Sequence, residues 1–97
     1  MYLPKVRNGA DHVYHQFVIR CNDRERLQKY LMENGLNTMV HYPIPPHLSK
    51  VYSWMNYKQG DFPITERYAD EVVSLPLYPG LKKEEITYVC EILAQFK

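Results

Sequence analysis

A chain of 97 residues with 45% hydrophobic and 24% charged side chains has the composition of one globular domain, and it is too short for a second. Its 12 basic and 11 acidic residues give a net charge of +1, which excludes the strongly basic surface expected of a protein that binds nucleic acid or an anionic membrane. No apolar run approaches the roughly 20 residues of a membrane span, and no signal peptide opens the chain, so the sequence predicts a cytoplasmic protein.

The two cysteines, Cys21 and Cys90, lie in the apolar runs FVIRC and YVCEIL. Widely spaced cysteines in apolar surroundings are typical of buried, reduced thiols rather than of a disulfide framework. A bridge between the two remains the alternative.

The first half of the chain predicts two strands and one helix. Residues 1–11 have the composition of a connecting segment, and residues 12–21 alternate in the manner of a strand. Residues 22–34 carry apolar side chains at helical spacing after an asparagine cap, and Gly35 ends this helix. Residues 36–42 then predict a second, short strand.

The second half predicts three helices and one further strand. A helix of about two turns is expected over residues 48–57, and another over 63–73, where a proline occupies the first turn. Residues 74–80 read as a short extended segment that ends in a Pro-Gly turn. Residues 82–96 form the clearest amphipathic helix of the chain.

This order of elements predicts an α+β fold of two layers, in which a sheet of about three strands has helices packed mainly on one face. Strand order and direction stay open, because helical crossovers favour parallel neighbours whereas long connections permit either arrangement. Residues 1–97 are expected to form a single domain.

Familiar catalytic and metal-binding patterns are missing from the sequence. His12 and His15 lie three apart on a predicted strand and would point to opposite faces, and neither cysteine belongs to a CxxC pair, so no metal site is predicted. The chain also has no GxSxG, GxGxxG, P-loop or HExxH motif, so we do not expect a self-contained enzyme.

The most unusual segment is HYPIPPHLSKVY, residues 41–52, with three prolines in four positions. Proline fixes φ and lacks a backbone donor, so this strip belongs neither inside a helix nor in the middle of a sheet. His41 and Tyr42 could simply cap a small core. Alternatively, the stiff backbone holds their side chains in place for a ligand and so lowers the entropic cost of binding.

Five ordered motifs carry a family resemblance. HVYHQFVIR, a helix ending in NGLNT, HYPIPPHL, GDFPITER and SLPLYPGLKKEEI together resemble the C-terminal small domain of the DegT/DnrJ/StrS aminotransferases, pyridoxal-phosphate enzymes that aminate nucleotide-linked keto-sugars. The resemblance extends from Val6 to Phe96. The form HYPIPPH is most similar to members that aminate position 3 of a dTDP-linked 3-keto-6-deoxyhexose.

The resemblance implies a homodimeric enzyme in which a large domain holds the pyridoxal phosphate and its Schiff-base lysine. The substrates would be a nucleotide sugar, expected to be dTDP-linked, and an amino-acid amino donor, for polysaccharide or glycan biosynthesis. No lysine here matches the required setting, so we expect a C-terminal fragment that is inactive alone, binds no cofactor or metal, and contains no catalytic residue. His41 and Tyr42 would be its substrate-binding residues, facing the sugar.

Four further residues lie within the same motifs, and a structural role is the favoured explanation for all of them. They are Arg20, His47, Phe62 and Glu66. Arg20 ends a predicted strand, whereas Phe62 and Glu66 open a helix, where a carboxylate near the N-terminus is favourable.

A free-standing interaction or regulatory module of the same fold is the alternative function. The two hypotheses differ in whether the reading frame continues upstream into a lysine-bearing domain. A domain separated from a larger enzyme should also show an uncovered interface, expected on the sheet face opposite the helices. The nine tyrosines agree with partly covered surfaces, although half-exposed tyrosines on a lone domain would look the same.

Overall fold

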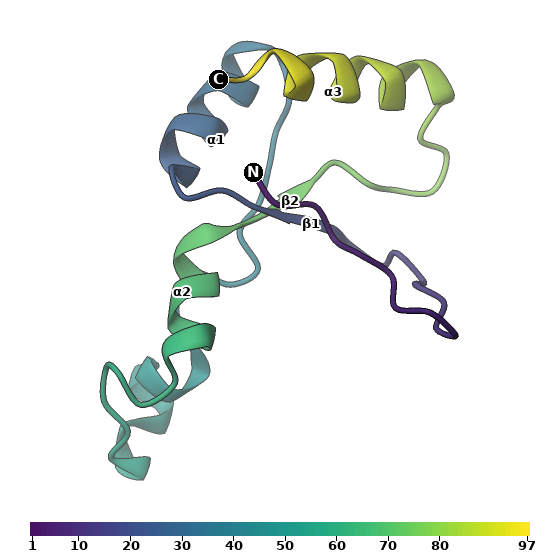
Figure 1. Cartoon of the computed structure of the whole chain (residues 1–97). Helices are drawn as coiled ribbons and strands as arrows, with labels where there is room; N and C mark the ends of the chain where they lie inside the picture. Colours follow the sequence, from purple (N-terminus) through teal and green to yellow (C-terminus); the bar gives the residue numbers. More distant parts are fainter.

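The computed structural model describes residues 1–97 and confirms the α+β class (Figure 1). Three α-helices, two strands and two 3-10 segments follow one another along the chain. In order they are β1 (Phe17–Arg20), α1 (Arg24–Glu33), η1 (Pro46–Leu48), η2 (Lys50–Met55), α2 (Pro63–Glu71), β2 (Val72–Leu75) and α3 (Lys83–Gln95).

The sheet consists of β1 and β2, which pair antiparallel with Ile19 opposite Val73. The strand expected over residues 36–42 is reduced to a single bridge between Met39 and Ser74. Its extension is blocked because the proline-rich strip follows at once, and proline has no N–H to continue a ladder. The sheet therefore has two strands, where the sequence predicted about three.

The first strand is shorter than the sequence predicts, because it begins at Phe17 and not at His12. The backbone N–H of Tyr14 donates to Nδ1 of His12 at 2.8 Å, and Tyr14 has a left-handed φ of 50°. This local turn uses the donor that a strand would need. At the other edge, Tyr2 pairs with Arg20, so part of the expected connecting segment 1–11 joins the sheet.

Helix α1 begins at Arg24, after Asp23, whose Oδ1 accepts a hydrogen bond from the backbone of Arg26 at 3.4 Å. The cap is therefore one residue later than the predicted asparagine. The helix ends as predicted: Gly35 has a φ of 81°, and the N–H of the next residue, Leu36, bonds back to the helix.

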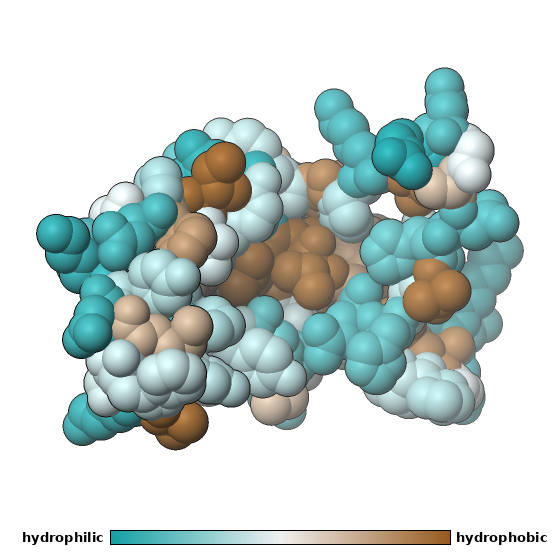
Figure 2. Space-filling view, turned by 90° about the horizontal axis from the view of Figure 1, so that it is seen from below, coloured by the Kyte–Doolittle hydropathy of each residue, from teal (hydrophilic) through white to brown (hydrophobic).

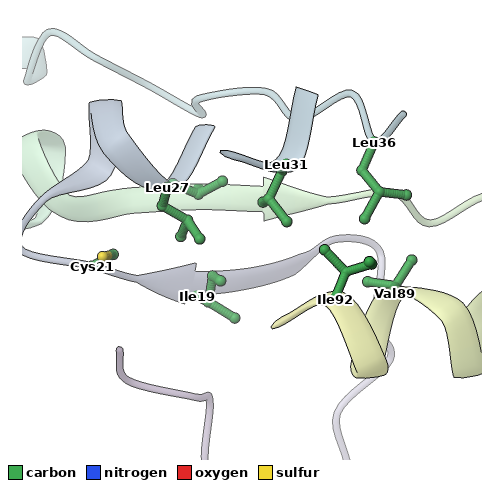
Figure 3. Close-up of a cluster of buried hydrophobic side chains, with 8 residues drawn as sticks. Ile19, Cys21, Leu27, Leu31, Leu36, Val89 and Ile92 are labelled. Carbon is green, nitrogen blue, oxygen red and sulfur yellow. The ribbon is translucent and has the colours of Figure 1, made fainter. Parts of the chain in front are cut away.

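The core lies between the sheet and the helices α1 and α3, which occupy the same side of it (Figure 1). In Figure 3, Leu27 and Leu31 point from α1 toward the strands, while Val89 and Ile92 approach from α3. The cluster comprises Ile19, Cys21, Leu27, Leu31, Leu36, Val73, Val89 and Ile92. The hydroxyl of Tyr30 adds a link by donating to the carbonyl of Ile92 at 2.8 Å.

Helix α2 and the two 3-10 segments form an arm that projects away from this core (Figure 1). The helix expected over residues 48–57 is 3-10 in form, over Lys50–Met55, and no side chain caps its start. Helix α2 begins at the predicted proline but ends at Glu71, because the chain passes directly into β2. The last strand consequently lies at Val72–Leu75, earlier than the predicted 74–80, and the prolines after it prevent further pairing.

The chain is more extended than a compact domain of its length. Its radius of gyration is 15.6 Å, whereas about 12.5 Å is expected for a compact chain of this length. Its accessible surface is 7775 Å², against about 5,800 Å² for a compact monomer of this mass. A large area is therefore available for contact with other polypeptide. None of the helices combines the length and hydrophobicity that crossing a bilayer requires.

Both cysteines are free, and only one of them is buried. Cys21 belongs to the core cluster, as the sequence predicts. The prediction was wrong for Cys90, which is exposed on α3. On α3, the side chain of Cys90 lies in an apolar groove beside the sheet, whereas Val89 and Ile92 belong to the core cluster.

Candidate functional site

His41 and Tyr42 lie at a cleft of about 590 Å³ between the proline strip, η2 and α2. Tyr52 contributes from η2, and Thr65 and Tyr68 contribute from α2. The first part of the strip forms one wall, in which Pro45 is extended and Pro46 opens the 3-10 segment η1. The structure thus brings the two predicted site residues together at a surface cleft and keeps both outside the hydrophobic core.

The imidazole of His41 is held by β2. Its Nδ1 lies 2.8 Å from Oγ of Ser74, a residue that is only 6% exposed. The backbone of Ser74 also exchanges two hydrogen bonds with Met39, at 2.7 and 3.3 Å. No hydrogen bond within the chain engages Nε2 of His41, so this nitrogen remains free for a ligand.

The phenol of Tyr42 is open to solvent, with 73% of the residue exposed. Its ring meets that of His41 edge-on, with the centroids 5.4 Å apart. The Tyr42 hydroxyl has no partner within the chain, so it can donate to or accept from a ligand. Two polar groups, one imidazole nitrogen and one phenol, are therefore presented side by side, an arrangement suited to binding hydroxyl groups.

An arginine fixes the α2 wall of the cleft. The guanidinium of Arg20 lies 4.2 Å from the ring centroid of Tyr68 and 4.6 Å from that of Tyr2. Its Nη1 is also 2.6 Å from Oε2 of Glu71, and both side chains are mostly buried. A planar cation can stack and form an ion pair at once. These contacts fit the structural role that the sequence favoured for Arg20.

A carboxylate pins the loop that leads into α2. Glu66 accepts from the N–H of Gly60 at 2.7 Å, from the N–H of Phe62 at 2.9 Å, and is 3.0 Å from Nε2 of the buried His47. The pKa of Glu66 lies below its ordinary value of 4.5, chiefly because the Gly60 N–H stabilises the charged form. His47 and Glu66 therefore hold the arm together, in agreement with the structural role expected for them.

The cleft residues do not by themselves fit pyridoxal phosphate. None of the residues that line the cleft is a lysine, so the amine that forms a Schiff base with this cofactor is not supplied there. No group of three or more histidine, cysteine or acidic side chains is arranged to hold a metal ion. The arrangement is suited to binding and orienting a polar ligand.

The sequence did not reveal the residues that complete or support the cleft. Thr65 and Tyr68 line it from a predicted helix, and Ser74, at the start of a predicted extended segment, holds His41 from outside the cleft lining. The available signal was that Ser74 is the one polar residue of an otherwise apolar strand, VVSL. A buried hydroxyl needs a partner, but the partner itself comes from 33 residues away.

A second feature of the surface is an apolar groove of about 560 Å³ between the N-terminal segment, the residues after β2 and α3. Eleven of its 12 lining residues are hydrophobic. Hydrophobic side chains are also visible in a hollow on the face viewed from below (Figure 2). An uncovered apolar surface is thus present, but the predicted place was wrong: the groove is lined by α3 and does not lie on a sheet face opposite the helices.

Residues 1–94 match the DegT/DnrJ/EryC1/StrS aminotransferase family, and the chain belongs to this family of pyridoxal-phosphate-dependent enzymes. The match confirms the resemblance carried by the five sequence motifs. The family includes sugar aminotransferases among its curated and solved members.

Individual relatives agree with this assignment. The chain is 44% identical over 96 residues to the dTDP-3-amino-3,6-dideoxy-alpha-D-galactopyranose transaminase of Aneurinibacillus thermoaerophilus, and 46% identical over 93 residues to a "pleiotropic regulatory protein" of Geobacillus stearothermophilus. These alignments cover 99% and 96% of this chain. They cover only 26% and 25% of the relatives, so the chain spans about a quarter of their length.

A solved structure shows the same fold. DesV of S. venezuelae, determined in complex with a ketimine intermediate, superposes with a TM-score of 0.90 at 34% identity. The superposition covers 95% of this chain and 25% of that protein. A unit with the same fold as this chain therefore makes up about a quarter of DesV.

Proposed function

We propose that this chain is the C-terminal, substrate-positioning domain of a homodimeric pyridoxal-phosphate aminotransferase that aminates a nucleotide-linked keto-deoxysugar, with an amino acid as donor. His41 and Tyr42 would contact the sugar hydroxyls. The transaminase relative that acts on a dTDP-linked amino sugar favours a dTDP-linked substrate. The product would serve polysaccharide or glycan biosynthesis.

The observation that carries the proposal is the paired presentation of His41 and Tyr42 at a surface cleft. One ring is fixed by Ser74, and the other is exposed without an internal partner. A histidine and a tyrosine that merely capped the core would have all their polar atoms engaged within the domain, whereas Nε2 of His41 and the hydroxyl of Tyr42 have no internal partner. Groups fixed in advance bind a polyhydroxylated ligand at a lower entropic cost.

The chemistry of amino transfer would belong to the remainder of the enzyme. When bound there, pyridoxal phosphate supplies the electron sink for the reaction. This chain contributes by orienting the sugar and by excluding water from one side of the site. The apolar groove would be covered by the cofactor domain of the same polypeptide, because the relatives are about four times as long as this chain.

The test uses the full-length enzyme with two site variants and a matched control. Tyr42→Phe and His41→Ala should each lower kcat/KM for the nucleotide sugar by about tenfold, because each removes a hydrogen bond worth about 1–1.5 kcal/mol. The cofactor absorbance should stay unchanged. Tyr14→Phe removes the hydroxyl of a tyrosine that is also exposed, at 43%, but lies outside the cleft, and it should have no effect. Wild-type kinetics for both site variants would remove His41 and Tyr42 from the substrate site.

A regulatory module of the same fold is the second candidate, favoured by the name of the Geobacillus relative. The two functions predict different reading frames. An open reading frame that continues upstream into a lysine-bearing domain supports the aminotransferase. Translation of the 97 residues alone would support the module.

A further inference from the structure

The hydrogen bond between His41 and Ser74 orients the imidazole ring and also leaves the direction of the bond open. Ser74 Oγ is nearly buried, and His41 Nδ1 at 2.8 Å is its single hydrogen-bond partner within the chain. A hydroxyl can either donate to the lone pair of Nδ1 or accept from Nδ1–H. Because nothing else engages this hydroxyl, it is free to turn either way.

Whether Nδ1 carries the proton of the neutral imidazole decides whether Nε2 is a hydrogen-bond donor or an acceptor toward the cleft. When Ser74 donates to Nδ1, the proton of a neutral imidazole resides on Nε2, which becomes a donor toward the ligand. When Ser74 accepts from Nδ1–H, Nε2 presents a lone pair and becomes an acceptor. A carboxylate at the place of Ser74 could only accept, and would fix one tautomer.

The backbone of the same residue limits movement of the strip. Ser74 N donates to Met39 O at 2.7 Å, and Met39 N donates to Ser74 O at 3.3 Å. Met39 lies two residues before His41, so a single residue of β2 holds both the main chain and the ring of the site. The ring therefore keeps its position while the hydroxyl changes its role.

We propose that Ser74 is the positioning residue of the substrate site, and that it lets His41 serve as donor or acceptor toward a sugar hydroxyl or carbonyl without moving the ring. This inference rests on the proposed function and assigns the role of Ser74 within it. Ser74 itself touches no ligand. Its effect passes entirely through His41.

A double-mutant cycle in the full-length enzyme tests this role. Ser74→Ala should lower kcat/KM for the nucleotide sugar about fivefold, the equivalent of one hydrogen bond of about 1 kcal/mol. In the His41→Ala background, Ser74→Ala should have no further effect on kcat/KM, because the group through which it acts is gone. Ser74→Thr keeps the hydroxyl and should restore most of the activity.

Ser53→Ala is the matched control, since Ser53 is exposed on η2 and does not line the cleft. Its kcat/KM and thermal unfolding midpoint should equal those of the wild type. For Ser74→Ala, the midpoint is measured beside the kinetics, and the same loss of activity in both His41 backgrounds would show a purely structural role and overturn the inference.

The outcomes separate the inference from the proposed function. If His41→Ala lowers kcat/KM and Ser74→Ala does not, the role of Ser74 is refuted while the substrate site stands. If His41→Ala and Tyr42→Phe both leave the kinetics unchanged, the substrate site itself is wrong, and the role of Ser74 is refuted with it. Loss of activity in Ser74→Thr as large as in Ser74→Ala would also contradict the role of the hydroxyl.

Discussion

Ile86 provides a direct test of whether the apolar groove is covered in the full-length enzyme. It lines the groove from α3 and is 46% exposed in this chain. Complete burial of an isoleucine side chain is worth about 1.5–3 kcal/mol, so covering the exposed 46% would add about 0.7–1.4 kcal/mol. If another domain covers the groove, Ile86→Ala also leaves a cavity, and it should lower the free energy of unfolding by about 2–5 kcal/mol.

Ile64→Ala is the matched control, because Ile64 is 64% exposed on α2 and lines neither the groove nor the cleft. Its cost should stay within about 0.5 kcal/mol. The assay is the thermal unfolding midpoint of the full-length enzyme by calorimetry, in which 1 kcal/mol corresponds to about 2–4 °C for a cooperative unit of 150–250 residues. Equal midpoints for the two variants would refute the assignment of the groove to an internal interface.

Two further predictions concern the supports of the cleft. Glu66→Gln should lower the urea midpoint of unfolding at neutral pH. A carboxylate whose folded-state pKa is lowered stabilises the fold above its ordinary pKa of 4.5, and this stabilisation is lost as the pH falls through the lowered pKa, so the difference from wild type should shrink in acid. A difference independent of pH would contradict stabilisation of the charged carboxylate by the N–H of Gly60. Arg20→Lys should destabilise the protein by about 1–2 kcal/mol in the same assay, because an ammonium cannot both stack on Tyr68 and pair with Glu71. An unchanged midpoint would show that the stacking contributes nothing.

Local signals in the sequence predicted the three α-helices, whereas the helix expected over residues 48–57 is 3-10. Gly35 ends α1 in the left-handed conformation, and a proline opens α2, as their positions along the chain indicate. These features depend on a few neighbouring residues, so they can be recognised without knowing the fold. The amphipathic pattern of α3 is of the same kind, although it did not reveal that Cys90 faces a groove.

The strands were harder to predict because their extent depends on pairing. Residues 12–16 alternate as a strand does, but no partner strand faces them, and Tyr14 turns back to His12. Residues 36–42 meet β2 only at Met39. Alternating apolar residues indicate that one face of a strand would be buried if a partner strand lay beside it. Whether such a partner exists depends on the fold.

The sequence by itself determined the family, through five ordered motifs, and it singled out His41 and Tyr42, because three prolines beside them mark a rigid strip. Only the tertiary structure showed that Ser74 holds the imidazole and that α2 supplies the opposite wall of the cleft. Motifs and prolines are recognised from residues that are adjacent in the sequence. A hydrogen bond across 33 positions exists only after the sheet has formed, so no local pattern could reveal it.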